Sequence, residues 1–214
     1  MSTTRKIAIA VVACFGLAAL AAGVAVGAKS VFGTKQTTHA RFAVPIHRIV
    51  VDGNAGDVKL TAGDRVDVSV KRTSNWLFSK PELRQYVRNG VLHLESHCRH
   101  GFLCDTNYAV RMPAGVAVEV DEDAADVQVH GAPGSVSVHS DAGDVDVEVA
   151  RAPLRIDVES NAGDVDVTVP RGTYAVIADT NAGDESVRGI VRYDRAAHAI
   201  RASTDAGDVT VTGR

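Results

Sequence analysis

A five-residue turn motif recurs six times along this chain and constrains its fold more than any other feature. Each copy has Asn or Asp first, then Ala, then Gly (Ala in one copy), then Asp and, in five copies, Val. The copies begin at Asn54, Asp123, Asp141, Asn161, Asn181 and Asp205. The last five start 18, 20, 20 and 24 residues apart. Such spacing predicts stacked structural units that each repeat one turn.

Apolar and polar residues alternate on both sides of each turn. Val136 and Val138 precede one copy, Val145 and Val147 follow it, and Asp146 takes an outward position. Period-two alternation is typical of strands with one buried face, and branched Val suits a pleated surface. Gly adopts positive φ at little cost, and Asn and Asp tolerate it. The glycines expected to form these turns are Gly56, Gly143, Gly163, Gly183 and Gly207.

Each period of about 20 residues holds two strands and two corners. A chain that returns to the same corner in every period predicts an all-β fold, a single-stranded β-solenoid. It would resemble a parallel β-helix with two sheets, about 20 residues per coil and the turn motifs in one column. A β-sandwich built from hairpins is the alternative. Glu185 replaces the first buried Val of its copy, so residues 185–198 are expected to be irregular.

The N-terminal segment has the composition of a membrane span. Arg5 and Lys6 precede an uncharged run of 22 residues, 7–28, and Lys29 follows it. At about 1.5 Å per residue, a helix of this length crosses a hydrocarbon core of roughly 30 Å. The preceding positive charges favour a cytoplasmic N-terminus. The sequence therefore predicts a single-pass protein of the cell membrane, held through residues 7–28, with its C-terminal domain outside the cytoplasm.

Two alternatives also export the domain. The small residues Val26, Gly27 and Ala28 fit a signal-peptidase site, so the chain would be secreted after cleavage near Ala28. The residues before Cys14 resemble a bacterial lipobox, which would place a lipid on that cysteine. The 22-residue length favours an uncleaved anchor.

The rest of the chain divides by composition. The expected parts are a transmembrane anchor or signal segment (1–29), a polar linker (30–45), an N-terminal β section with a cysteine loop (46–112) and the β-solenoid repeats (113–214). Ser79–Glu82 resembles a helix start with Pro in the first turn, and Asn89–Gly90 would end a short helix or a tight turn. The N-terminal β section is expected to cap one end of the stack. The last coil, near Arg214, would leave an open edge.

Cys98 and Cys104 are separated by five residues. Outside the reducing cytosol two nearby thiols usually pair, so we expect a structural disulfide. The alternative is a metal site with His93, His97 and His100, but zinc-binding cysteines are usually closer and often occur as two pairs.

The charge is unevenly distributed. Residues 1–112 hold 15 Lys and Arg against 7 Asp and Glu, whereas residues 113–186 hold 3 against 16. An acidic block repels nucleic acid and anionic lipid, so no nucleic-acid partner is expected. The block is a solvated face or attracts cations or a basic partner. The calcium candidates are Asp144, Asp164, Asp184 and Asp208, which a stacked fold would place in one column. In the alternative interpretation each Asp satisfies its own turn.

The repeats and the stretch before them resemble a known family. Asn107-Tyr-Ala-Val-Arg-Met-Pro-Ala-Gly115, then Val-Ala-Val-Glu-Val and the Ala-Gly-Asp-Val turns, are similar to the bacterial "putative adhesin" family of β-repeat domains. The resemblance covers about residues 46–214. It implies an extracytoplasmic β-solenoid in a family whose members are often exported or anchored, some with links to envelope-stress systems. It implies no catalytic residues.

The sequence offers no recognisable catalytic pattern. Nucleophile motifs of the Gly-x-Ser-x-Gly type and phosphate loops of the Gly-x-x-x-x-Gly-Lys type are absent. Carboxylates recur with the repeat, which is typical of architecture. We therefore expect no enzyme activity and no cofactor.

The expected function is an adhesin-like binding or scaffold module of the cell envelope, whose repeat surface contacts an envelope protein or wall polymer. The alternatives are an accessory or sensory protein of an envelope-stress system and a calcium-binding repeat domain. The sequence leaves the oligomeric state open.

Overall fold

The computed structural model of the chain describes residues 33–99 and 103–214. The expected membrane segment, residues 7–28, lies outside the described residues, as do Cys14 and His100. Within the described part, no helix is long and apolar enough to cross a membrane. Residues 35–214 form one compact unit.

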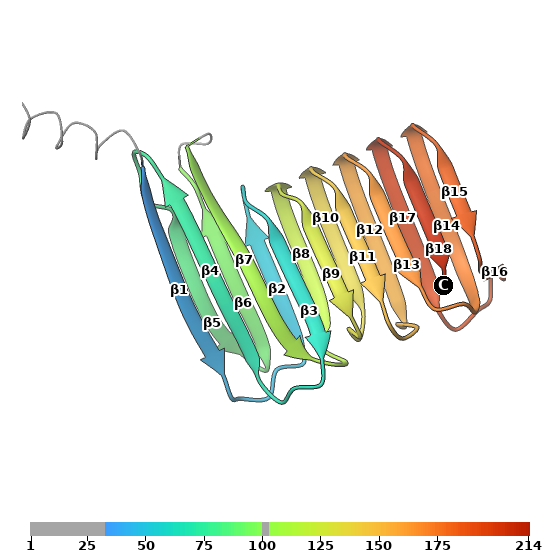
Figure 1. The fold of residues 1–214 in the computed structure, drawn as a ribbon, viewed down its shortest axis with the longest axis horizontal. Helices are drawn as coiled ribbons and strands as arrows, with labels where there is room; N and C mark the ends of the chain where they lie inside the picture. The colour runs from blue at the N-terminus through green and yellow to red at the C-terminus, as the bar shows by residue number, and fades with distance from the viewer. Residues whose placement is uncertain (1–32, 100–102) are drawn as a thin grey trace, which may run out of the picture. The chain divides into compact units, whose positions relative to one another are not determined.

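The described residues form strands in two nine-stranded sheets, so the prediction of an all-β fold with two sheets is confirmed (Figure 1). In chain order the strands are β1 (Thr34–Phe42), β2 (Arg48–Gly53), β3 (Val58–Gly63), β4 (Val68–Trp76), β5 (Glu82–Arg88), β6 (Val91–His97), β7 (Cys104–Pro113), β8 (Ala117–Ala124), β9 (Val127–Gly131), β10 (Val136–Ala142), β11 (Val145–Val149), β12 (Arg155–Ala162), β13 (Val165–Val169), β14 (Thr173–Ala182), β15 (Glu185–Arg188), β16 (Val191–Arg192), β17 (Ala199–Ala206) and β18 (Val209–Gly213).

Each coil contributes one strand to each sheet. Sheet A has the order β1-β4-β7-β3-β9-β11-β13-β18-β15, and sheet B has the order β16-β14-β17-β12-β10-β8-β2-β6-β5. Neighbouring repeats pair in parallel with equivalent residues side by side, as Val145 with Val165 in sheet A and Val136 with Ile156 in sheet B. Antiparallel pairing of the kind that the hairpin alternative requires occurs in the N-terminal part, where β4 pairs with β7 and β5 with β6.

The order of the coils in space differs from their order in the chain at both ends of the stack. The coil β17/β18 lies between β12/β13 and β14/β15, and the coil β2/β3 lies between β6/β7 and β8/β9. The turn at Asp205 therefore stacks on the turn at Asn161, and the turn at Asn181 is outermost. The expectation that the last coil forms the open edge is wrong, because β15 takes that edge of sheet A. The long 24-residue interval supplies the chain that crosses back over the outermost coil.

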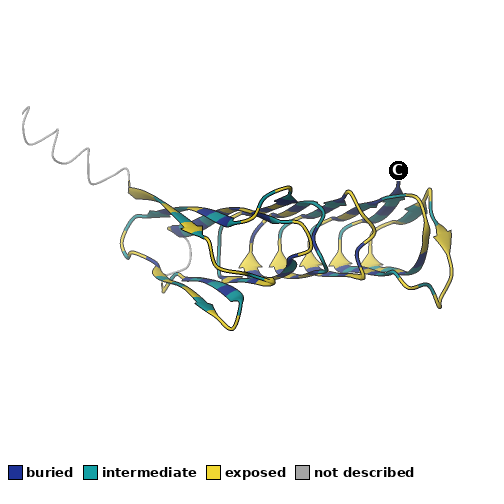
Figure 2. Ribbon diagram, turned by 90° about the horizontal axis from the view of Figure 1, so that it is seen from below, coloured by how far each residue is buried: buried dark blue, intermediate teal, exposed yellow. Residues whose placement is uncertain are grey.

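The core is a thin apolar layer between the two sheets. Val and Ile fill the inward positions of the repeats, and Leu60, Leu92, Leu94 and Tyr108 fill those of the N-terminal part. Figure 2 shows the two sheets as two layers, with buried residues along the strands of both. Burial of these side chains supplies the main driving force for folding.

The expected irregularity between residues 185 and 198 is confirmed. β15 has four residues and β16 has two. Glu185 stands opposite the buried Val209 but is itself exposed, because β15 is an edge strand. Its carboxylate accepts the backbone N–H of Thr180 at 3.2 Å.

Two expectations for the N-terminal part are wrong. Residues 34–42 of the expected linker form β1, which lies beside β4 in sheet A. Residues 82–88 form a strand in place of the expected helix, because Leu83, Gln85 and Val87 alternate with exposed residues. The expected tight turn is confirmed, since Asn89 (φ 50°) and Gly90 (φ 73°) connect β5 to β6.

Candidate binding surface

The last Asp residues of the turn motifs form a hydrogen-bonded column. In each step a carboxylate oxygen accepts the backbone N–H of the equivalent Asp in the next coil. The N···O distances are 3.1 Å from Asp144 to Asp126, 2.9 Å from Asp164 to Asp144, 2.8 Å from Asp208 to Asp164 and 2.8 Å from Asp184 to Asp208. The four calcium candidates thus lie in one column, and Asp144, Asp164 and Asp208 each have an oxygen engaged by the backbone.

No group of three or more His, Cys, Asp or Glu side chains with the geometry of a metal site occurs among the described residues. The hydrogen bonds of the column join neighbouring coils, and calcium binding stays a prediction. Melting temperatures measured in millimolar Ca²⁺ and in chelator test it.

The first residues of the motifs form a second set of contacts, in pairs. The amide of Asn54 donates to Asp123 at 2.9 Å, that of Asn161 to Asp141 at 2.7 Å and that of Asn181 to Asp205 at 2.8 Å. Each pair gives a carboxylate an amide donor in the neighbouring coil. Each Asn therefore stands beside an Asp, which reduces the repulsion that a continuous row of Asp would create.

The hydroxyl group that precedes each of the last four motifs lies inside the corner, and these groups form a third ladder. Ser160 donates to the carbonyl of Gly143 at 3.2 Å, Thr204 to that of Gly163 at 2.9 Å and Thr180 to that of Gly207 at 2.9 Å. These bonds satisfy carbonyl groups of the tight turn.

The turn glycines are required by geometry as well as by conformation. Gly163 has φ 147°, and a Cβ atom there would lie 2.1 Å from the carbonyl oxygen of Gly143 in the next coil. Only a residue without a side chain permits this approach. The other predicted turn glycines, Gly56, Gly143, Gly183 and Gly207, also have positive φ.

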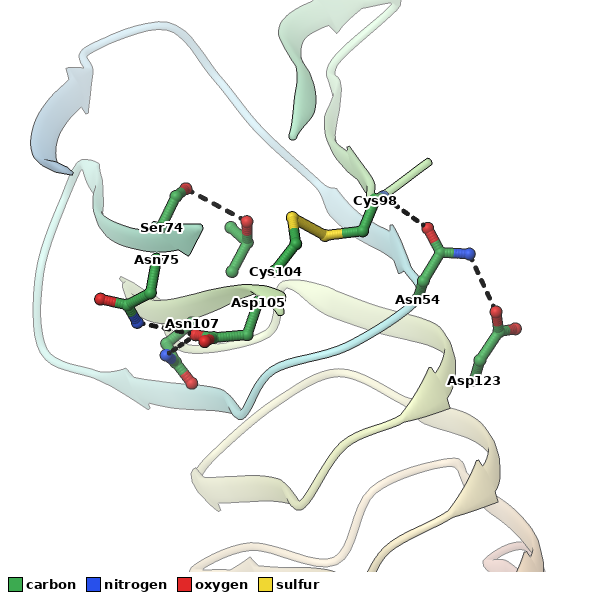
Figure 3. Close-up of a disulfide and its surroundings, with 9 residues drawn as sticks. Asn54, Ser74, Asn75, Cys98, Cys104, Asp105, Asn107 and Asp123 are labelled. Atoms are coloured by element: carbon green, nitrogen blue, oxygen red, sulfur yellow. Dashed lines mark hydrogen bonds between the residues drawn. A yellow bond between two sulfur atoms is a disulfide. The ribbon is translucent and has the colours of Figure 1, made fainter. Parts of the chain in front are cut away.

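The expected disulfide between Cys98 and Cys104 is present, with an S–S distance of 2.08 Å (Figure 3). It connects the end of β6 in sheet B to the start of β7 in sheet A. The backbone N–H of Cys98 donates to Asn54 Oδ1 at 3.0 Å, and Asn54 in turn donates to Asp123. The cysteine loop is therefore joined to the first turn of the stack.

Glu122 is a buried carboxyl group at the boundary between the two parts of the molecule. It stands in register with Ser140 but carries a carboxyl group in place of the hydroxyl, and its side chain packs on Gly53. The residue is 1% exposed, and neither carboxyl oxygen has a hydrogen-bond partner among the residues that the structure describes. Burial, with the charges of three neighbouring Asp side chains, raises its pKa to about 8. Glu122 is sealed from solvent, which suits a structural role.

The outer face of sheet A carries a cationic hollow over β1, β4 and β7, which we call the cationic trough. Its volume is about 540 Å³, and its charged or titratable lining residues are His39, Arg41, Arg65, Lys71 and Arg111. Lys71 lies beside Ala109, and Arg111 lies beside Ser69. The hollow forms because a small side chain stands next to each long cationic one.

Only part of this positive charge is neutralised locally. Asp67 forms ion pairs with Arg65, at 2.8 Å, and with Arg41. The hydrogen bond from Arg65 and the charge of Arg41 hold the pKa of Asp67 below its usual value, so Asp67 stays ionised. Lys71 and Arg111 have no ion pair with any side chain in the described part of the chain. These two cations are available to an anion.

The other half of the same face is acidic. Asp146 and Asp166 lie side by side on β11 and β13, and Glu148 follows on β11. Partial burial, with the charge of Asp146, raises the pKa of Asp166. The outer face of sheet A is therefore divided into a cationic half and an anionic half.

Sequence reasoning expected a binding surface on the repeats and missed the trough. Its residues come from β1, β4 and β7, which are distant in the chain and adjacent only in the folded sheet. The excess of Lys and Arg in residues 1–112 was the available signal.

The fold has a counterpart among solved structures. It is similar to the fold of a putative cell adhesion protein from Clostridium sporogenes. The two share 12% sequence identity with a TM-score of 0.61, over 85% of this chain and 100% of that chain. A putative adhesin from Bacteroides fragilis matches at 12% identity with a TM-score of 0.33, over 85% of this chain and 98% of that one.

A putative lipid binding protein from Parabacteroides distasonis matches at 10% identity with a TM-score of 0.24, over 84% of this chain and 97% of that one. Comparison with protein-family models and with characterised proteins finds no match. At 12% identity the Clostridium protein shows a shared fold.

Proposed function

We propose that this chain is a non-enzymatic binding module of the cell envelope that uses the cationic trough to hold an anionic wall polymer. The observation that carries the proposal is the trough itself, a hollow of about 540 Å³ where Lys71 and Arg111 pair with no carboxylate of residues 33–99 or 103–214. Cations on a concave surface attract a polyanion and orient it, and the acidic half of the same face repels it.

The parallel stack supports a scaffold role. Equivalent residues of neighbouring repeats pair in register, and three ladders of side-chain hydrogen bonds run along one corner of the stacked repeats. We propose that these coils form a β-solenoid, with the N-terminal β section (46–112) as its cap and the repeats (113–214) as its body. We also propose that residues 7–28 tether the module to the membrane with the β domain outside the cytoplasm.

Binding of the purified full chain to isolated wall polymer tests the proposal. The variant Lys71→Glu/Arg111→Glu should lose most of its binding, and wild-type binding should weaken as salt rises, because exposed charges are screened. The matched control is Arg84→Glu/Arg88→Glu, which makes the same charge change on exposed residues of β5.

Two results would contradict the proposal. One is binding that survives reversal of both trough cations. The other is equal loss in the β5 variant, which would show that net charge and no particular surface governs binding.

A further inference from the structure

Several large apolar side chains are exposed, and two of them stand together at one corner of the molecule. Phe78 is 79% exposed in the loop after β4, and Leu103 is 46% exposed just before β7. Leu77 donates its backbone N–H to the carbonyl of Leu103 at 2.9 Å, which holds the two segments side by side. Trp76 pairs with Cys104 directly beneath them. We call Trp76, Leu77, Phe78 and Leu103 the apolar tip.

The apolar tip has cationic neighbours. Lys80 places its ammonium group 5.7 Å from the centre of the Trp76 ring, and the exposed Arg99 lies just beyond Cys98, the disulfide partner of Cys104. Aromatic and aliphatic side chains rimmed by Lys and Arg are typical of protein surfaces that enter the interfacial region of a phospholipid bilayer. In that region the rings meet the apolar boundary while the cations meet phosphate groups.

The chain enters the fold at this same corner. Thr37 on β1 contacts Thr73 on β4 at 3.3 Å, and Arg41 pairs with Asp67 just before β4, so β1 runs antiparallel to β4 (Figure 1). The start of β1 therefore lies at the end of β4, where the apolar tip begins. From residue 28 to residue 35 the chain spans at most about 25 Å, since each residue covers no more than about 3.5 Å.

We propose that the apolar tip docks into the interfacial layer of the phospholipid bilayer from which the chain emerges. The bilayer is the expected partner because the chain between residues 28 and 35 is short. With a membrane span at residues 7–28, this connection cannot hold the corner far from the bilayer surface. The proposal rests on the proposed tether and adds a second membrane contact to it.

Other exposed apolar residues lack this position. Ile177, 58% exposed, belongs to β14 in the outermost coil. That coil lies seven strand spacings from β4, or about 34 Å at the usual spacing. Val66, 96% exposed, precedes β4 and lies at the opposite end of the strand from Phe78.

The acidic turn column fixes which part of this edge can touch lipid. Asn54 and Asp123 join the cysteine loop to the first turns of the stack, and the Asp column runs from Asp126 along the same corner to Asp184. Anionic headgroups repel it, so the stack should rise from the bilayer with the apolar tip as its contact.

The single Trp of the chain provides the test. The full chain is reconstituted into phosphatidylcholine vesicles with one quarter phosphatidylglycerol and with lipids brominated near the headgroup as quenchers. Trp76 of the unaltered chain should be quenched. In a Trp76→Phe background, Phe78→Trp should be quenched more strongly and Ile177→Trp should not be quenched. The native Trp76 signal decides the matter without any variant, should Trp76→Phe impair folding.

A matched substitution measures the contribution of the tip. Phe78→Ser should lower the ratio of docked to undocked tip by about tenfold, the loss expected when a large apolar side chain no longer leaves water. Val66→Ser should leave that ratio unchanged.

Flotation of the same samples separates the two proposals. A chain that floats with vesicles but shows no quenching at positions 76 and 78 overturns the docking and leaves the tether intact. A chain that does not float overturns both the tether and the docking, while binding of wall polymer keeps its own test. Equal quenching at positions 78 and 177 also overturns the docking, because the membrane contact would then be unspecific.

Discussion

The repeats and the N-terminal part of the molecule hold parallel coils in register by different means. From β8 to β18 three ladders run along the corner that holds the turn motifs, made by Asp carboxylates, Asn–Asp pairs and Ser or Thr hydroxyls. From β1 to β7 the corner is held by a disulfide, two antiparallel pairings and Asn54, which links the disulfide to the first repeat. A ladder contact needs an equivalent residue in the neighbouring coil, so it can be repeated along the stack. The end of the stack has no such neighbour on one side and requires contacts of its own.

The two parts also differ in what their surfaces offer. The repeats present small and acidic side chains at regular intervals, and the Asp residues of their turns are engaged in the column. The N-terminal part carries the cationic trough and the apolar tip, both built on β4. The regular ladders therefore make the repeats rigid, and the candidate binding features lie in the N-terminal part, where the regular pattern ends.

The largest expected effect comes from filling a turn of the repeats. Gly163→Ala would place a Cβ atom 2.1 Å from the Gly143 carbonyl oxygen at a residue with φ 147°. We expect the free energy of unfolding to fall by about 3 to 5 kcal/mol, because backbone strain and a steric clash combine. Chemical denaturation followed by circular dichroism measures the change.

Gly63→Ala is the matched control in the N-terminal part. No atom lies within 4 Å of a Cβ placed there. We expect a change of at most about 1 kcal/mol, toward greater stability, because Ala restricts the unfolded chain. Equal losses in both variants would remove the distinction between a stacked turn and an open one.

The next effect concerns Glu122, at the boundary between the two parts. Its pKa is about 8 in the folded chain against the reference value of 4.5, so between these pH values unfolding releases a proton. The contribution of Glu122 to stability should therefore be greatest below pH 4.5 and be lost as pH rises toward 8. The loss from Glu122 alone is on the order of 3 kcal/mol between pH 5 and pH 8, at about 1.4 kcal/mol per unit.

Glu122→Gln should flatten this dependence. The slope of the free energy of unfolding against pH is the quantity to compare, because a buried amide carries its own desolvation cost. Glu119→Gln, an exposed carboxyl on the same strand, should keep the wild-type slope. A wild-type slope in Glu122→Gln would show that the folded chain does not hold this proton.

The repeats were predictable because one local pattern determines both strands and turns. Alternating Val residues predicted the buried face of β10 to β13, and Gly at the third motif position predicted a positive φ that the structure contains at Gly143 and Gly163. Each of these features depends on residues within one coil, which is the range that a sequence pattern can report.

The misses depend on contacts between distant segments. The coil β17/β18 lies inside the coil β14/β15, although it comes later in the chain. Predicting this order requires contacts between coils, and no local sequence pattern reports those contacts. The helix expected after Ser79 is a strand because β5 pairs with β6, which overrides the helix signal of Pro81. The trough was missed because Arg41, Lys71 and Arg111 meet only across β1, β4 and β7.

Removal of the disulfide should affect the two parts unequally. Cys98→Ala/Cys104→Ala opens a loop of seven residues, which corresponds to about 2 kcal/mol of stabilisation for a loop of this length. Amide hydrogen exchange should accelerate at the end of β6 and the start of β7 and stay unchanged in β10 to β13, because local openings remain confined to one region. Uniform acceleration would instead mean that the cysteine loop stabilises the whole stack.

The smallest expected effect tests the Asn–Asp pairs of the repeats. Asn161→Asp replaces an amide that donates to Asp141 at 2.7 Å with a second carboxylate. We expect a loss of about 0.5 to 1 kcal/mol at low salt, because like charges on neighbouring strands repel. The loss should diminish in 1 M NaCl, whereas Asn161→Ala, which removes the bond without adding charge, should show no such recovery. If both variants respond alike to salt, the hydrogen bond itself is what matters, and avoidance of repulsion would not explain why each Asn stands beside an Asp in the stack.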